Sequence, residues 1–340
     1  MGLTRVELEN FTAFRSLKLD LCPGVNVLVG ANGTGKTHLM KVCYAACNAT
    51  RTPAGVDFVQ KLVAVFLPSG WKQERLCRRQ QGAPSEASIR VERGDASLSM
   101  GLSSDPSVPS VVKYREKWVG EPFKAIFIPT KEMLANAPGF RSLYAERRVY
   151  FEETYRDILD LAYLPPLRQL DSRDERLLAV LQKTVGGEVA VEGEEFFLRN
   201  GHGSLEFSLL AEGLRKLALL WLLIRNGAFQ PGSILFWDEP ETNLNPRQFG
   251  VVIDVLLELQ RAGVQIFLAT HDYVILKELD LRATAADKVA YHALYQKEEA
   301  REVHCDTTCN YRDVHPNAIA DTFTDLYNRE IRRSLRGAAR

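Results

Sequence analysis

The sequence predicts an α/β fold in which a mixed sheet is flanked by helices and carries a phosphate-binding loop. Three apolar runs support this interpretation, because each one reads as a buried strand that ends in polar residues. The run at residues 25–29 precedes a glycine-rich loop and a helical stretch at 37–49. The runs at residues 233–237 and 264–269 end in an acidic pair and in a Thr-His-Asp sequence, respectively.

The opening segment predicts two strands joined by a turn. Residues 4–9 and 17–20 alternate between apolar and polar side chains with a period of two. The turn between them contains Phe11 and Phe14, whose rings are candidates for packing beneath the sheet.

Residues 30–37 form a P-loop motif. They read Gly-Ala-Asn-Gly-Thr-Gly-Lys-Thr and satisfy the pattern G-x-x-x-x-G-K-[ST]. The glycines let the backbone wrap around a phosphate chain, so that its N–H groups and the following helix N-terminus point at the anion. Lys36 is expected to reach the β- and γ-phosphates, and the Thr37 hydroxyl to coordinate Mg²⁺. The predicted ligands are ATP and Mg²⁺, and the predicted nucleotide-binding residues are Gly30, Asn32, Gly33, Thr34, Gly35, Lys36, Thr37 and His38.

Residues 51–205 are expected to form an inserted, mainly helical lobe within a single domain that spans 1–340. The insert also contains a predicted hairpin at residues 88–100 and a core strand at 124–128. Helical patterns follow from 131 to 181, interrupted at Pro138-Gly139 and at Pro165-Pro166. Heptads do not persist over several repeats, so a long coiled coil is not expected.

The acidic pair Asp238–Glu239 follows an apolar strand, which is the Walker B pattern. A buried strand can aim Asp238 at the Mg²⁺ shell, while Glu239 can polarise a water for in-line attack on the γ-phosphate. Acidic pairs are also common where ordinary strands end, but the P-loop upstream favours the catalytic interpretation.

Together these motifs resemble the ABC-type ATPase heads of the SMC, RecF and OLD families, and the small ATPases of bacterial anti-phage systems such as the Septu ATPase subunit. Residues 238–245 look like the Walker B motif plus D-loop of that group. Thr270-His271-Asp272 looks like its switch histidine, and residues 210–216 occupy the place of its signature loop.

The resemblance implies further roles for individual residues. His271 would sense the γ-phosphate, and the loop around Gly213 would close the ATP site of a second copy. ATP would therefore drive formation of a homodimer or a higher even-numbered oligomer. The opening hairpin lies beside adenine and ribose in the resembled families, which makes Phe14 and Arg15 candidates for nucleotide contact. Packing of Phe14 under the sheet is the alternative.

The chain also departs from that pattern. Ala211 stands where the signature loop usually offers a serine hydroxyl to the γ-phosphate. The glutamine of the usual Q-loop cannot be placed, because none of the candidates that follow the first helix lies directly after a strand. These candidates are Gln60, Gln73, Gln80 and Gln81.

The resemblance implies an ATPase that controls a separate effector, a nuclease or toxin, in anti-phage defence or DNA metabolism. A transporter ATPase subunit and a stand-alone RecF-like repair ATPase are the alternatives. The transporter is disfavoured because an LSGGQ-like loop and a Q-loop are missing. An OLD-type nuclease module is not expected, since the roughly seventy residues after His271 contain no Asp-x-Asp pair. The final amphipathic helix at 319–335 and the insert are candidate docking surfaces.

Composition sets limits on partners and compartment. The 43 basic and 43 acidic side chains give zero net charge, so no global field attracts nucleic acid or a membrane. DNA remains a candidate ligand of local arginine clusters at 78–79, 147–148 and 332–336, which otherwise read as solvated helix faces. The longest apolar stretch, 217–224, is too short to span a bilayer. Six cysteines without a disulfide framework predict a cytoplasmic protein.

Overall fold

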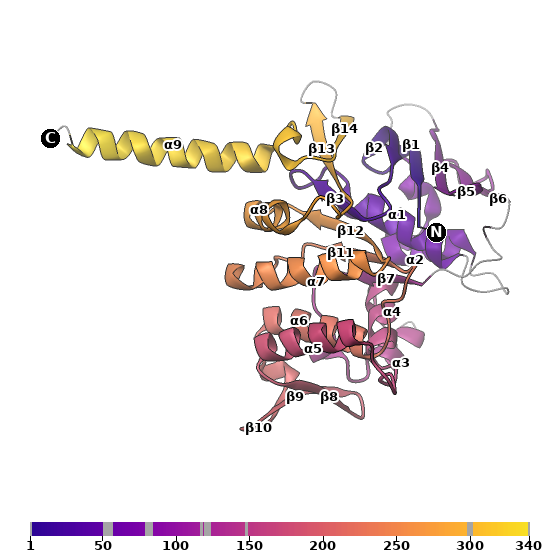
Figure 1. Ribbon diagram of the computed structural model, residues 1–340. Coiled ribbons are helices and arrows are strands. Elements are labelled where there is room, and N and C mark those ends of the chain that lie inside the picture. Colours follow the sequence, from indigo (N-terminus) through magenta and orange to yellow (C-terminus); the bar gives the residue numbers. More distant parts are fainter. Residues whose placement is uncertain are drawn as a thin grey trace.

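A computed structural model describes residues 2–49, 57–78, 84–115, 118, 124–146, 149–297 and 302–338. Its helices and strands are arranged around a six-stranded central sheet, with an antiparallel sheet beside it and a small helical lobe below (Figure 1). None of the described helices is long and apolar enough to cross a membrane.

The central sheet carries the residues predicted to bind nucleotide. Its strands lie in the order β14-β13-β3-β12-β11-β7 and are parallel except for the edge strand β14. Their bounds are β3 (Val25–Val29), β7 (Ala125–Ile128), β11 (Ile234–Asp238), β12 (Gln265–Thr270), β13 (Val289–Lys297) and β14 (Glu302–Thr308). Strands β3, β11 and β12 are buried along their whole length, as expected for a parallel sheet covered on both faces.

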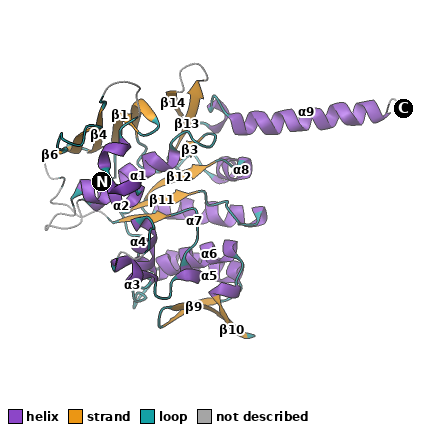
Figure 2. Ribbon diagram, turned by 180° about the vertical axis from the view of Figure 1, so that it is seen from behind, coloured by secondary structure: helices purple, strands orange, loops and turns teal. Residues whose placement is uncertain are grey.

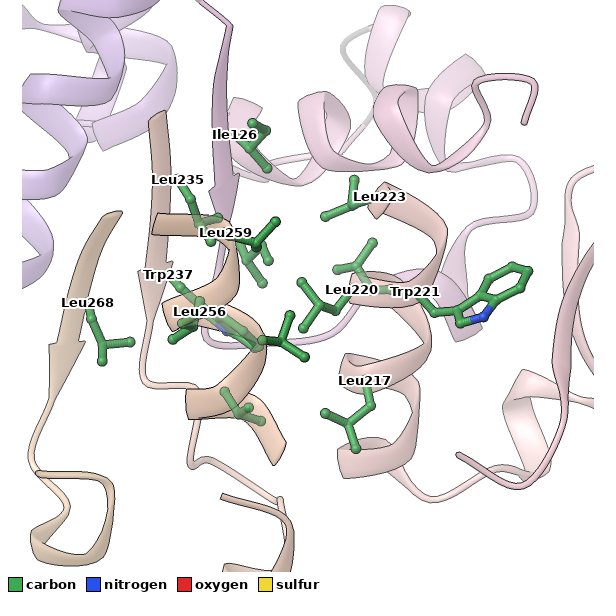
Figure 3. Packing of buried hydrophobic residues seen from close by; sticks show 14 of the residues in the cluster. Ile126, Leu217, Leu220, Trp221, Leu223, Leu235, Trp237, Leu256, Leu259 and Leu268 are labelled. Atoms are coloured by element: carbon green, nitrogen blue, oxygen red, sulfur yellow. The ribbon is translucent and has the colours of Figure 1, made fainter. Parts of the chain in front are cut away.

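Alternate residues of the central strands enter two separate cores. In β11, Leu235 and Trp237 face a core built mainly with helices, whereas Ile234 and Phe236 face a second core that includes the antiparallel sheet. Figure 3 shows Leu235 beside Leu259 and Trp237 beside Leu256, both leucines belonging to α7, with Leu220 of α6 beyond them. The helices around the sheet are α1 (Lys36–Asn48), α2 (Phe58–Phe66), α6 (Glu212–Arg225), α7 (Phe249–Arg261) and α8 (Tyr273–Arg282).

The predicted opening hairpin is confirmed and is extended by part of the insert. Strands β1 (Arg5–Phe11) and β2 (Phe14–Asp20) pair antiparallel, and β4 (Glu86–Arg93) joins the free edge of β1. Strands β5 (Ala96–Ser103) and β6 (Val111–Arg115) complete this sheet. The alternating burial of β4 explains the pairing, because its apolar side chains continue the core beneath β1.

The segment at 51–205 is therefore divided among three places and is less helical than the sequence predicted. Residues 86–115 belong to the antiparallel sheet, and β7 belongs to the central sheet. The described residues of this segment that follow β7 form the lobe, with α3 (Phe140–Ala145), α4 (Glu153–Ala162), α5 (Ser172–Val185), β8 (Glu188–Glu192), β9 (Glu195–Asn200) and β10 (Gly203–Glu206).

The last helix, α9 (Ala318–Ala338), projects away from the body. Both views show a single straight helix attached at its N-terminal end near α8 (Figures 1 and 2). A long coiled-coil hairpin does not occur in the described parts of the chain, in agreement with the sequence analysis.

Candidate nucleotide-binding site

The P-loop lies between β3 and α1, as predicted, and its backbone requires glycine at two positions. Gly33 and Gly35 have φ angles of 82° and 87°, in the left-handed region that favours glycine. At Gly35 a Cβ atom would also lie 2.6 Å from the Phe14 ring. Phe14 is fully buried beneath the loop, so the packing role considered for it is the one observed.

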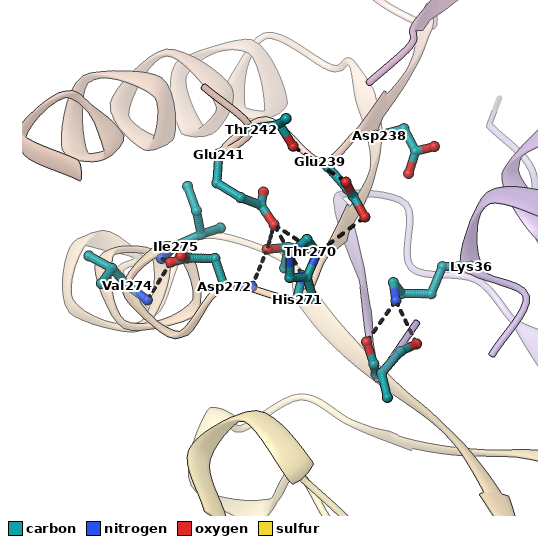
Figure 4. Close-up of polar contacts among 12 residues, drawn as sticks. Lys36, Asp238, Glu239, Glu241, Thr242, Thr270, His271, Asp272, Val274 and Ile275 are labelled. Carbon is teal, nitrogen blue, oxygen red and sulfur yellow. Dashed lines mark hydrogen bonds and ion pairs between the residues drawn. The ribbon is translucent and has the colours of Figure 1, made fainter. Parts of the chain in front are cut away.

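Lys36 folds back into the loop. Its ammonium donates hydrogen bonds to the Gly30 carbonyl at 2.7 Å and to the Ala31 carbonyl at 3.0 Å (Figure 4). Burial lowers the Lys36 pKa, and the charges of Glu239 and Asp238 oppose that shift. A cation held inside a ring of backbone groups is suited to exchange these two carbonyls for phosphate oxygens.

Thr37 and Asp238 meet, although they are 201 residues apart in the chain. The Thr37 hydroxyl donates to Asp238 Oδ2 at 2.9 Å. Asp238 Oδ1 is buried and has no hydrogen-bond partner among the described residues. Burial raises the Asp238 pKa, while Thr37 and, more weakly, Thr130 lower it. An unsatisfied carboxylate oxygen beside a hydroxyl fits the hard oxygen ligands that Mg²⁺ prefers.

Glu239 begins a strained turn. Its φ is +50°, which is uncommon for a residue with a side chain, and its amide donates to the Ala269 carbonyl at 2.9 Å. His271 Nδ1 lies 3.1 Å from one Glu239 carboxylate oxygen, and the Thr242 hydroxyl donates to the other at 3.3 Å (Figure 4). The structure therefore brings together the two residues predicted to be catalytic, Glu239 and His271, on a partly exposed edge.

Glu241 is a buried carboxylate to which the sequence analysis gave no role. Its Oε1 accepts hydrogen bonds from the Thr270 hydroxyl at 2.7 Å and from the His271 amide at 3.1 Å. Burial raises the pKa of Glu241. The side chain thereby fixes the backbone that presents His271. In the sequence, only its place in the Asp-Glu-Pro-Glu segment could have indicated a role for Glu241.

Lys216 is a second residue that the sequence analysis did not single out. It comes from α6 and is almost completely buried. Its ammonium donates to the Thr242 carbonyl at 2.8 Å and to the Glu239 carbonyl at 3.4 Å. This lysine ties the helix after the signature loop to the turn that carries Glu239. Burial lowers its pKa, and Glu212 and Glu241 oppose the shift.

Gly213 has a structural role within the chain. A Cβ atom there would lie 2.3 Å from the Asn243 carbonyl oxygen and 2.9 Å from Leu244 Cα, so α6 can approach the D-loop only through a glycine. The predicted contact of Gly213 with the nucleotide of a second copy stays a prediction. Ala211, which precedes the helix, is exposed and gives no side-chain cap to its free N–H groups.

The remaining candidate residues are placed less directly. Arg15 is exposed and forms an ion pair with Glu302 of β14, and no described contact connects it to the P-loop. His38 lies in the first turn of α1 beside the Phe66 ring, and burial lowers its pKa to about 4. Thr130 follows β7. Arg79, Gln80, Gln81, Arg147 and Arg148 lie outside the described residues.

Similar proteins place the chain among P-loop ATPases. Residues 119–277 match the family described as "AAA domain, putative AbiEii toxin, Type IV TA system", and residues 5–60 match an AAA domain family. The DNA replication and repair protein RecF of Lactobacillus gasseri is 26% identical over 207 residues, which cover 56% of this chain and 51% of that protein. The chain thus matches about half or less of the length of its curated relatives.

Solved structures agree on the fold. The SMC head domain from Thermotoga maritima superposes with a TM-score of 0.52 at 13% identity, covering 91% of this chain and 99% of that one. An SMC head bound to the C-terminal winged-helix domain of ScpA superposes with a TM-score of 0.57 at 11% identity, covering 91% and 98%. Residues 5–60 and 119–277 thus match AAA-domain families, the sequence is similar to RecF, and the fold is the ABC-type fold of the SMC heads.

Proposed function

We propose that the chain binds and hydrolyses ATP with Mg²⁺ in the cytoplasm, and that ATP joins two copies to control a separate effector protein. The observation that carries the proposal is the position of Glu239. It lies next to the Mg²⁺-suited pair Thr37–Asp238 and within 3.1 Å of His271, while Lys36 occupies the adjoining loop.

Each side chain has a distinct part in the proposed reaction. Lys36 binds the β- and γ-phosphates, while Thr37 and Asp238 Oδ1 hold Mg²⁺, which neutralises the phosphate charge when bound. Glu239 accepts a proton from the attacking water, and its carboxylate is oriented by His271 and Thr242. His271 is held by Glu241 and can contact the γ-phosphate, because its side chain is 43% exposed.

The proposed dimer uses the uncapped N-terminus of α6. Its free N–H groups favour an anion, and the neighbouring Leu209 is 70% exposed. A second copy that presents its γ-phosphate to this terminus would satisfy those groups and cover Leu209. The likeness to an SMC head with a bound ScpA domain supports a head that also docks another protein.

A matched set of variants separates binding from turnover. Glu239→Gln should keep ATP affinity and lose turnover by about 10²–10⁴-fold, since an amide cannot act as a base. Lys36→Ala should weaken ATP binding itself. Affinity comes from fluorescent ATP titration and turnover from phosphate release. Equal loss of ATP affinity in both variants would contradict these roles.

The dimer is tested by light scattering of Glu239→Gln with ATP and Mg²⁺. Ala211→Asp should abolish the ATP-dependent gain in mass, because it places a negatively charged carboxylate opposite the γ-phosphate that the second copy presents. Aspartate is a good N-cap, so the helix itself should not be weakened. Ala211→Ser is the matched neutral cap and should preserve association. An unchanged mass in Ala211→Asp would refute the shared site.

The biological role is proposed from the relatives. The AbiEii-type description favours a toxin-linked or anti-phage system, and the match to RecF favours DNA metabolism. Control of a nuclease or toxin effector predicts that the purified chain does not cleave nucleic acid with ATP and Mg²⁺ or Mn²⁺. A stand-alone RecF-like role is the second candidate, and it predicts that duplex DNA alone changes ATP turnover without any partner protein.

A further inference from the structure

Helix α9 carries an apolar stripe that no other described part of the chain covers. Only its first turns are anchored: Ile319 is buried, and the Phe323 ring stacks on Tyr273 with 4.5 Å between ring centroids. Beyond this contact the helix extends away from the body in both views (Figures 1 and 2). The rest of the stripe therefore faces solvent in a single copy.

The stripe has the spacing of a helix-packing surface. Its members recur every three or four residues, which places them on one face of the helix. The exposed members are Phe323 (45%), Leu326 (53%), Tyr327 (63%), Ile331 (40%) and Leu335 (67%). Helices in proteins gain most of their stability from packing such a face against another surface, so a projecting helix of this kind favours contact with a second apolar surface.

Charge is distributed unequally along the same helix. Residues 318–327 contain two aspartates and no basic residue, whereas residues 328–338 contain four arginines and one glutamate. One half of α9 is therefore acidic and the other half is basic. A helix with this pattern is complementary to a copy of itself running in the opposite direction, and it repels a copy running in the same direction.

We propose that α9 pairs antiparallel with α9 of a second copy, about a two-fold axis near Tyr327. This register sets Ile319 level with Leu335 and Phe323 level with Ile331, so that the apolar stripes coincide. It also sets each acidic half against the partner's basic half. The contact is isologous, as expected for a dimer of identical chains.

The proposed contact does not involve the nucleotide site and does not rest on the proposed ATPase activity. α9 begins 47 residues after His271 in the chain and shares no described contact with Lys36, Asp238 or Glu239. Pairing through α9 should therefore occur without ATP. If ATP also joins heads, the two contacts together give even-numbered assemblies.

The first test is the mass of the full chain by light scattering without nucleotide, across a dilution series. The wild type should approach twice the 38.2 kDa chain mass. Leu326→Glu with Ile331→Glu should shift the midpoint of dissociation at least tenfold toward higher concentration. Ala318→Glu with Thr322→Glu adds the same charge outside the stripe and should not. A monomeric wild type, or equal behaviour of the two double variants, would overturn the proposal.

The second test reverses charges at exposed positions of α9. Asp321→Arg with Asp325→Arg makes the whole helix basic, and Arg329→Glu with Arg333→Glu makes it acidic. Each variant alone should dissociate at least tenfold more readily than the wild type, and an equimolar mixture should recover association as a heterodimer. Circular dichroism checks that both remain folded.

Failure of the mixture to associate would overturn the antiparallel arrangement. Anionic vesicles containing phosphatidylserine provide the competing partner. If the wild-type chain stays monomeric and binds these vesicles through the stripe, the partner of α9 is a lipid surface and the proposed pairing with a second copy is wrong. Because no step of either test uses ATP, failure here is distinguishable from failure of the proposed ATPase function.

Discussion

Replacing Lys216 by methionine should slow ATP turnover without weakening ATP binding. Methionine has a similar length and fits a buried site, but it cannot donate hydrogen bonds. The Thr242 and Glu239 carbonyls would lose their donor from α6, at 2.8 and 3.4 Å respectively. The Glu239 turn, with its left-handed φ of +50°, would then keep the hydrogen bond from its amide to the Ala269 carbonyl but lose the hydrogen bonds from Lys216.

The size of the effect follows from these contacts. Losing a charged donor costs about 1–3 kcal/mol in unfolding free energy, and the lower desolvation of methionine offsets part of this cost. A shift of about 1 Å in a reacting group can reduce rate by about 10²-fold. We therefore expect kcat to fall about 10- to 100-fold. The P-loop does not contact Lys216, so ATP affinity should change less than about threefold.

Arg225→Met is the matched control on the same helix. Arg225 also donates to a backbone carbonyl, that of Leu167 at 2.7 Å, but lies at the far end of α6. Phosphate release gives kcat, fluorescent ATP titration gives affinity, and urea unfolding gives stability. A similar loss of stability with nearly normal kcat is expected for the control. Equal kcat in the two variants, or a loss in Lys216→Met confined to ATP affinity, would refute the positioning role.

Two further predictions concern stability. Gly213→Ala should lower the free energy of unfolding by about 1–3 kcal/mol even without nucleotide, because its Cβ would lie 2.3 Å from the Asn243 carbonyl; unchanged urea unfolding would exclude this intrachain role. Burial lowers the pKa of His292 from 6.5 to about 4, so the unfolded chain binds more protons than the folded chain between these pH values. The free energy of unfolding should therefore fall by about 3 kcal/mol from this residue as pH drops from 6.5 to 4. His292→Gln should remove its part of that pH dependence and leave the part that His38 contributes, and an unchanged slope would assign the dependence to other groups.

Much of the site follows from the sequence, because its motifs are local. The P-loop, the acidic pair and His271 each occupy a short segment at the end of an apolar strand. Strands β3, β12 and β11 are neighbours and parallel, so these strand ends meet at one edge of the sheet. Hydrophobic periodicity predicted the strands, and parallel pairing brought together residues that are 200 positions apart.

The rest depends on contacts that local patterns do not encode. The sequence shows a lysine in an apolar helix, but only the packing of α6 reveals that Lys216 reaches the Thr242 carbonyl. The close fit of Gly213 against Asn243 within the chain was not predicted either, and its contact with a second copy stays a prediction. The pairing of β4 with β1 was missed for the same reason, since strand partners distant in sequence are chosen by the whole topology.

Helix α6 links the proposed dimer contact to the catalytic residues by several short connections. Lys216 holds the turn of Glu239, and Gly213 lies directly against Asn243. Arg215 forms a 3.1 Å ion pair with Glu132, which lies in the loop after β7 next to Thr130. Because these connections are buried and closely packed, α6 cannot move far without displacing the loops after β7 and β11. A second copy that contacts the N-terminus of α6 would therefore act on the position of Glu239 as well as on the nucleotide.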